Sequence, residues 1–142
     1  MTTRTAPDLI ATLEDIGCRI TGSRRRVVAL LEGKSGAFGA EELTTALPGV
    51  GRATVYRTIR LLLEAGALCK TSLPDGSPRY TRDQPLHHHH AVCERCGRVE
   101  EFRHSSVERL LRAVKSEVPG TVVGHKLEIY IVCDDCLAVR PA

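Results

Sequence analysis

The sequence contains few aromatic residues: it has no Trp, two Phe and three Tyr. Its 142 residues suffice for one or two small domains. Small domains bury a low fraction of their surface, and aromatic side chains supply much of the apolar area that a core buries. We therefore expect bound metal or association with another chain to add to the stability that packing provides.

Signals for export and for membrane insertion are also missing. The first ten residues, MTTRTAPDLI, contain no apolar run, and no stretch approaches the about 18 apolar residues of a membrane span. We expect a cytoplasmic protein without a membrane partner. Because the cytosol is reducing, six cysteines in such a protein favour metal binding over disulfides.

A large net charge is absent as well, since the chain carries only +3, but the positive charge is unevenly placed. Residues 1–86 hold 12 Lys and Arg against 9 Asp and Glu, whereas residues 87–142 hold 8 of each kind. Between Arg19 and Arg60 there are 8 basic and 3 acidic residues. Such a basic segment indicates a nucleic-acid partner for the N-terminal half.

The pattern of residues 1–82 predicts a winged helix-turn-helix domain. Apolar residues recur at helical spacing, and turn residues separate four helices from two short strands. In such domains the second helix of the pair enters the DNA major groove, and the wing contacts the backbone. The helices are expected over residues 7–16, from Thr21 onward, over 40–47 and over 52–64, and the strands over 67–73 and 78–81.

The fourth predicted helix carries most of the candidate DNA-binding residues. Val55, Ile59, Leu62 and Leu63 form its apolar stripe, which leaves polar side chains on the open side. Arg24 begins an arginine run where cations oppose a helix dipole, and this run is either a solvated face or a phosphate contact. The alternative for the whole domain is a helical core with a solvated cationic face. The candidates are Arg24, Arg52, Thr54, Tyr56, Arg57 and Arg60.

The remaining chain predicts a second, small α/β domain over residues 87–142, joined by a polar, proline-containing hinge at 83–86. The chain as a whole is therefore expected to be α+β. A long strand in so small a domain exposes an edge that a partner chain can cover. The expected elements are strands at 87–93 and 98–102, a helix from 105 or 106 to 118, and a long alternating strand at 121–132.

Two Cys-x-x-Cys pairs, Cys93/Cys96 and Cys133/Cys136, are separated by 36 residues. Each pair places two sulfurs on one tight turn, and two pairs give four-sulfur coordination that suits Zn²⁺ at about 2.3 Å per bond. No coordination position remains open, so the pattern predicts a structural zinc that ties the last strand to the first hairpin. Redox or disulfide use is the alternative, and the lone Cys18 is expected to be structural.

Four consecutive histidines at residues 87–90 precede the first cysteine pair. Alternate residues of a strand point to opposite faces, so His87 and His89 face one way and His88 and His90 the other. Each pair needs further ligands to complete a metal site. His125 lies on an apolar strand face, and it is either one of these ligands or a histidine of the core. A site with ligands from both domains would fix their angle and so gate DNA binding. The candidate further ligands are Cys69, Asp83, Glu101, Glu108 and His125.

With these motifs in place, nearly the whole chain resembles the ferric uptake regulator family of metal-dependent repressors. The resemblance rests on GCRIT at residues 17–21 before the arginine-rich helix, ATVYR at 53–57 and Tyr80 in the wing. It continues through HHHHAVCERC at 87–96 and GRVEEF at 97–102, and the pair Cys133/Cys136 completes it.

The resemblance implies a homodimer in which each chain has a DNA-binding winged helix and a dimerisation domain. The four cysteines match the structural zinc site of the family, and His88 and His90 match its sensory site at the hinge. Tyr56 and Arg57 match positions that contact operator DNA. A further metal site is implied for His87, His89, Glu108 and His125.

The sensed metal is expected to be zinc. Iron- and peroxide-sensing members commonly bring a His or Glu from near the start of the third helix, where this chain reads AFGA at residues 37–40. Members similar to zinc uptake regulators use an Asp on the first wing strand and a Cys just after the second. Here Cys69 and Asp83 exchange those places, and with His88 and His90 they favour tetrahedral zinc. The alternative is an iron, manganese, nickel or peroxide sensor.

Two hypotheses come from other classes of protein. A zinc hydrolase is conceivable, because three His and an acid can activate water, but the sequence has no His-Glu-x-x-His helix. A metal-storage module would leave the basic helix-turn-helix half without a role. We therefore expect a regulator and not an enzyme.

Overall fold

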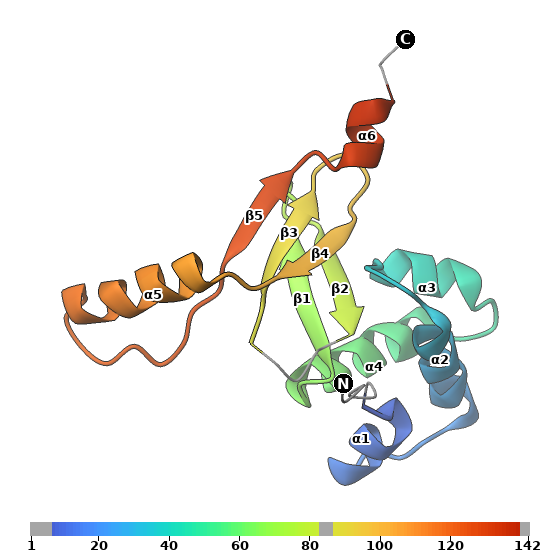
Figure 1. The fold of residues 1–142 in the computed structure, drawn as a ribbon. Coiled ribbons are helices and arrows are strands. Elements are labelled where there is room, and N and C mark those ends of the chain that lie inside the picture. The colour runs from blue at the N-terminus through green and yellow to red at the C-terminus, as the bar shows by residue number, and fades with distance from the viewer. Residues whose placement is uncertain (1–6, 83–86, 140–142) are drawn as a thin grey trace, which may run out of the picture. The chain divides into compact units, whose positions relative to one another are not determined.

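The computed structural model describes residues 7–82 and 87–139, and the chain divides into two compact units, Met1–Gln84 and Pro85–Ala142. Each unit is described by itself (Figure 1). The predicted hinge at 83–86, which includes Asp83, lies outside the described residues. Among the described residues, no helix combines the length and the apolar character that crossing a bilayer requires.

Unit 1 contains four helices followed by an antiparallel hairpin, as the sequence predicts. The hairpin pairs Leu68 with Arg82 at one end and Ser72 with Pro78 at the other. An isolated bridge between Phe38 and Tyr80 connects the hairpin to the segment before the third helix. The elements are α1 (Leu9–Asp15), α2 (Gly22–Gly33), α3 (Ala40–Ala46), α4 (Arg52–Glu64), β1 (Leu68–Ser72) and β2 (Pro78–Arg82).

Local capping fixes where these helices begin. The Asp8 carboxylate accepts hydrogen bonds from the first backbone N–H groups of α1, and the Thr21 hydroxyl accepts one from the Arg24 N–H in α2. At α3 the Glu42 carboxylate accepts the Gly39 N–H at 3.2 Å. These bonds satisfy donors that have no partner within the helix. The starts of α2 and α3 agree with the sequence prediction, whereas α1 begins at Leu9 and not at residue 7, because Asp8 is its cap.

The core of unit 1 draws apolar side chains from all four helices and from the wing. Val55, Ile59 and Leu62 of α4 are buried as predicted, whereas Leu63 is only half-buried. Thr58 is buried in its place, and its hydroxyl donates to the Thr54 carbonyl at 2.7 Å. The hydrogen bond lets a polar side chain occupy the apolar stripe. Other buried members are Leu9, Leu13, Val27, Val28, Leu31, Phe38, Leu43 and Tyr80.

Unit 2 is built on a sheet in which β3 lies between β4 and β5 (Figure 1). β3 pairs antiparallel with β4 and parallel with β5, and all of its residues are buried. The elements are β3 (His89–Cys93), β4 (Val99–Phe102), α5 (Ser105–Glu117), β5 (Glu128–Ile131) and α6 (Asp134–Ala138).

The prediction of a long strand at 121–132 is wrong. Only Glu128–Ile131 forms a strand, and residues 121–127 have no regular structure. The parallel pairing runs from His90 opposite Glu128 to Cys93 opposite Ile131, and of the earlier residues Leu127 accepts one further bond from the His90 N–H at 3.3 Å, just before the strand begins. Alternation of apolar residues therefore overestimated the strand, and the short helix α6 was not predicted.

The apolar face of α5 is uncovered within the described chain, where none of the helix residues is buried. Figure 1 shows α5 projecting away from the sheet of unit 2. Exposed apolar side chains continue beyond the helix and onto the edge strand β5. An apolar surface of this kind marks a protein–protein contact. The exposed apolar side chains are Leu110, Val114, Val118, Val123, Ile129 and Tyr130, the last two on opposite faces of the edge strand.

Candidate metal centres and DNA-binding face

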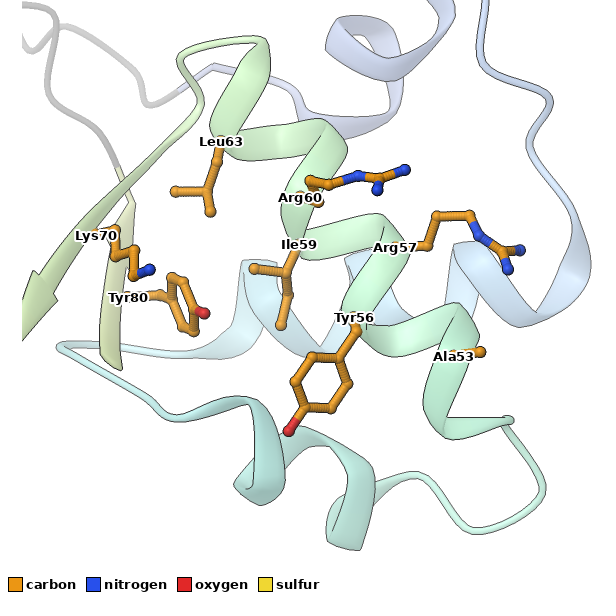
Figure 2. Close-up of a pocket in the computed structure, with 8 residues that line it drawn as sticks. All are labelled: Ala53, Tyr56, Arg57, Ile59, Arg60, Leu63, Lys70 and Tyr80. Atoms are coloured by element: carbon orange, nitrogen blue, oxygen red, sulfur yellow. The ribbon is translucent and has the colours of Figure 1, made fainter. Parts of the chain in front are cut away.

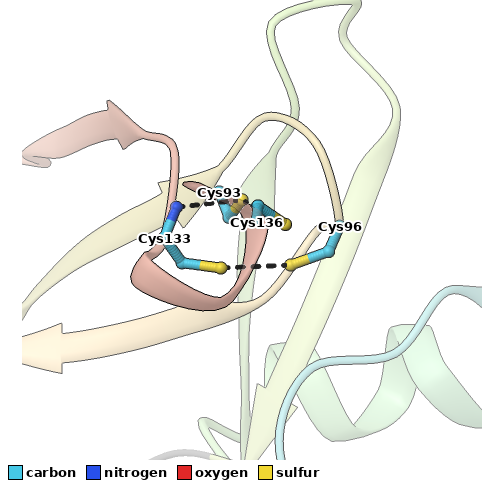
Figure 3. A group of neighbouring side chains, drawn as sticks. All are labelled: Cys93, Cys96, Cys133 and Cys136. Carbon is cyan, nitrogen blue, oxygen red and sulfur yellow. Dashed lines mark hydrogen bonds between the residues drawn. The ribbon is translucent and has the colours of Figure 1, made fainter. Parts of the chain in front are cut away.

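Four cysteine sulfurs gather at one end of the sheet of unit 2 (Figure 3). Cys93 ends β3 and Cys96 lies in the turn before β4, while Cys133 caps α6 and Cys136 lies within it. The Sγ atoms of Cys93 and Cys136 are 3.9 Å apart, and those of Cys96 and Cys133 are 3.7 Å apart. All four sulfurs lie within 4.8 Å of one another.

These distances fit a tetrahedral zinc site. Four ligands at 2.3 Å from a central ion are separated from one another by about 3.8 Å, which agrees with both sulfur pairs. The cysteines are not joined by disulfides. A four-thiolate site has no open position, so bound zinc would supply cross-linking and no reaction.

The thiols of this cluster do not lose their protons equally. The backbone N–H of Cys133 donates to Cys93 Sγ at 3.4 Å, and this bond, together with the backbone N–H groups of Cys96 and Arg95, lowers the pKa of Cys93 to about 6. The side chain of Cys133 raises the pKa of Cys136 to about 12. The first thiolate therefore forms easily near neutral pH, whereas a full set of thiolates requires a cation to offset their repulsion.

A second cluster lies around His87, His89, His125 and Glu108. His89 Nε2 lies 2.8 Å from Glu108 Oε1, and His87 Nε2 lies 3.6 Å from the same oxygen. His87 and His125 approach at 2.9 Å between their Nε2 atoms. Ligands at 2.0–2.1 Å from a tetrahedral ion are about 3.3–3.4 Å apart, and the ligand atoms of His87, His89 and His125, which lie within 4.8 Å of one another, could converge on one ion, with Glu108 beside them.

The electrostatics of the second cluster suit a divalent cation. A hydrogen bond with His89 lowers the pKa of Glu108, which keeps the carboxylate charged. Burial lowers the pKa of His87, and the neighbouring His89 and His125 lower it further. Neutral imidazoles beside a carboxylate are the forms that bind metal.

The even-numbered histidines form a separate pair. The rings of His88 and His90 meet edge to face with centroids 4.8 Å apart, and His88 Nε2 lies 3.6 Å from Glu101 Oε1. β3 begins only at His89, but the rings of residues 87 and 88 still keep the alternation of the strand. Of the other predicted hinge ligands, Cys69 lies half-buried in β1 of unit 1.

The exposed side of α4 presents Arg52, Tyr56, Arg57 and Arg60, whereas Thr54 is half-buried. Figure 2 shows Tyr56, Arg57 and Arg60 on this helix beside a groove of about 450 Å³. The wing contributes Lys70 and Tyr80 to the groove. Sequence reasoning missed Lys70, although a lysine on the exposed face of a wing strand is a usable signal.

Arg24 has a different environment from the arginines of α4. Its guanidinium donates to the Arg19 carbonyl at 2.6 Å and contacts the Thr58 hydroxyl at 3.5 Å, so it joins the start of α2 to α4. Arg26 donates to the Pro48 carbonyl at 3.3 Å, whereas the side chain of Arg25 is exposed. These contacts explain why Arg24 and Arg26 occupy the first turns of α2, where the helix dipole disfavours positive charge.

Comparisons with known proteins agree with these features. The sequence pattern of the Ferric uptake regulator family matches residues 15–130. The Ferric uptake regulation protein of Neisseria meningitidis is 34% identical over 134 residues, which cover 91% of this chain and 93% of that protein.

Two solved structures are similar in fold and sequence. A zinc-bound manganese uptake regulator superposes with a TM-score of 0.69 and 30% identity, covering 89% of this chain and 99% of its own. A zinc uptake regulator complexed with zinc and DNA gives a TM-score of 0.64 and 27% identity, covering 96% and 97%.

Replacing Cys133 by Ser should remove zinc from the four-cysteine cluster and unfold unit 2, because metal binding supplies part of its folding free energy. Zinc content and the thermal unfolding of purified protein measure the effect. Cys18→Ser, in unit 1, is the matched control and should leave both unchanged. A Cys133→Ser protein with full zinc content and unchanged unfolding would contradict the assignment.

Proposed function

This chain belongs to the ferric uptake regulator family, and from that premise we propose that it is a zinc-responsive repressor that binds operator DNA as a homodimer. The chain is a metal-responsive regulator and not an enzyme. One observation carries the proposal: a basic, exposed helix in unit 1 accompanies preorganised thiol and imidazole clusters in unit 2. Its action on DNA and its reduced thiols suit the cytoplasm.

The DNA-binding face is proposed to be the exposed side of α4. Arg52, Arg57 and Arg60 can contact phosphates or guanine edges, and the Tyr56 ring can pack on bases. Thr54, half-buried at the start of the same face, is proposed to make a shorter-range contact. Arg24 is proposed to contact only a phosphate of the DNA backbone, which requires that its hydrogen bond to the Arg19 carbonyl break.

The regulatory ligand set is proposed to be Cys69, Asp83, His88 and His90. One thiolate, one carboxylate and two imidazoles favour tetrahedral zinc over six-coordinate iron. A site with ligands from both units binds metal and DNA cooperatively if one arrangement of the units suits both. A zinc uptake regulator among the similar structures is complexed with zinc and DNA, which supports this choice. Iron, manganese, nickel or peroxide sensing within the same family is the alternative.

The second cluster is proposed as a further metal site. Its ligands come from β3 and the residues just before it, from the first turn of α5 and from the segment before β5. Metal bound by His89 and Glu108 would hold the base of α5 against the sheet. This matters because the helix has no buried residue of its own within the described chain.

The homodimer is proposed to cover the apolar surface of unit 2. Leu110, Val114 and Val118 are exposed on α5, and Ile129 and Tyr130 are exposed on the edge strand β5. A second copy of the chain offers the same surface, and such self-complementary contact is the commonest form of protein assembly. The dimer also carries two DNA-binding helices, one for each half-site of an operator.

Zinc should restore operator binding to metal-stripped protein at lower free concentration than ferrous iron or manganese does. The measurement is a fluorescence-anisotropy titration under reducing conditions with buffered metals. Cys69→Ser should weaken the zinc response while leaving the fold intact, and Cys18→Ser is the control. Restoration by ferrous iron at the free levels found in cells, with none by zinc at sub-nanomolar free levels, would reject zinc sensing.

Arg57→Ala should weaken operator binding by about 1–3 kcal/mol, because it removes a charged contact from the recognition helix. Zinc content should not change, since Arg57 belongs to none of the proposed ligand sets. Arg112→Ala removes the same charge from α5 and serves as the control. Equal operator affinity for Arg57→Ala and wild type would remove this residue from the interface.

Leu110→Asp should convert the dimer to a monomer, because it buries an unpaired charge at the proposed contact. Sedimentation velocity over a range of protein concentrations measures the change. Ser116→Asp adds the same charge to another face of α5 and should leave the dimer intact. If Leu110→Asp remains dimeric, another surface forms the contact.

A further inference from the structure

Glu41 of α3 holds two of the proposed DNA-binding side chains. Its Oε2 accepts a hydrogen bond from Arg52 Nη1 at 2.9 Å, and its Oε1 accepts one from the Tyr56 hydroxyl at 2.5 Å. The second Arg52 nitrogen also contacts Oε1. The guanidinium lies 5.3 Å from the centre of the Tyr56 ring, so the three groups form one cluster.

This cluster is exposed, which limits its contribution to stability. The side chains of Arg52 and Glu41 are 63% and 61% exposed. Exposed ion pairs typically contribute about 0–1 kcal/mol, so the fold does not require this one. The consequence for DNA binding is larger, because the carboxylate neutralises a cation on the face that phosphates would approach.

The hydroxyl of Tyr56 is committed as well. Its hydrogen bond to Glu41 raises the pKa of Tyr56, and the same bond lowers the pKa of Glu41. At neutral pH the phenol therefore stays protonated, and its hydroxyl donates a hydrogen bond to the carboxylate. A hydroxyl in that state does not donate to a phosphate, whereas the apolar ring remains available to bases.

We infer that Glu41 is a specificity-determining positioning residue, which withholds Arg52 and the Tyr56 hydroxyl from phosphates of non-cognate DNA. The inference rests on the proposed function. Sequence-independent affinity comes mostly from phosphate contacts, so a carboxylate that competes for a cation subtracts from it. A cognate sequence offers base contacts in addition, and those offset the cost of displacing Glu41.

The neighbouring Glu42 provides a matched control. Its carboxylate contacts Arg79 at 2.7 Å and Lys34 at 3.3 Å, on the side of the wing and α2. Glu41→Gln and Glu42→Gln each remove one negative charge from α3. Only the first removes the ion pair of Arg52 on the proposed DNA-binding face, whereas in the second Arg79 should stay held by its bond to the Ala37 carbonyl at 3.1 Å.

The test compares zinc-loaded wild type, Glu41→Gln and Glu42→Gln on two probes over a range of salt concentrations. One probe is a pool of duplexes with randomised sequence, and the other is a duplex that wild type selects from that pool. Glu41→Gln should bind the random pool about two- to fivefold more tightly per chain. Its slope of log K against log salt should steepen by about 0.9 per chain, which reports one additional phosphate contact.

The selected duplex should gain less affinity, so the ratio of specific to non-specific binding falls. The double variant Glu41→Gln/Arg52→Gln should return the salt slope to that of wild type, because the released cation is gone. Thermal unfolding of each variant separates these effects from a change in the fold, and Glu42→Gln should keep the wild-type slope.

The inference is overturned if Glu41→Gln and Glu42→Gln steepen the slope equally, because bulk charge then explains the effect. It is also overturned if Glu41→Gln weakens binding to both probes, since the carboxylate then only supports the helix. If wild type with zinc selects no duplex from the pool, the proposed function itself fails. An unchanged ratio of specific to non-specific binding in Glu41→Gln, by contrast, overturns the inference about Glu41 and leaves the proposed function standing.

Discussion

Successive side chains of β3 point to opposite faces of its sheet, and this alternation determines which metal ligands of unit 2 can meet. His89 faces Glu108, whereas His90 pairs with His88 on the other face. The strand then ends at Cys93, whose sulfur joins the four-cysteine cluster. A slip of one residue in this strand would exchange the two faces and disassemble the histidine sets.

The two units obtain their stability from different sources. Unit 1 buries apolar side chains from four helices and the wing, including the contact of Phe38 with Tyr80. Unit 2 buries few apolar side chains, among them Val92 and Val99, and its central strand is occupied largely by potential ligands. The scarcity of aromatic residues therefore affects the two halves unequally, which supports the proposal that unit 2 is stabilised by bound ions and by a partner.

The features that the sequence predicted correctly are those that depend on residues close together in the chain. The helix start at Thr21, the two wing strands and the Cys-x-x-Cys spacing within each cysteine pair are all short-range signals, and the structure has the corresponding elements. The length of β5 was not predictable, because it depends on how far β3 extends beside it. The contacts of Arg24 with Thr58 and of Glu41 with Arg52 could not be predicted either, since each joins two different helices.

The short helix α6 has a consequence for the lifetime of the protein. Its five residues are far below the about 12–15 that an isolated helix needs, and none is buried within the described chain. Contacts of Cys133 and Cys136 with the other two cysteines join it to the end of β3 and the following turn, and Arg98 with Asp135 and Arg95 with the Cys136 carbonyl add to them. If the cluster holds a metal ion as proposed, α6 is the part of unit 2 whose order depends most directly on that ion, and its loss would expose the helix to proteases.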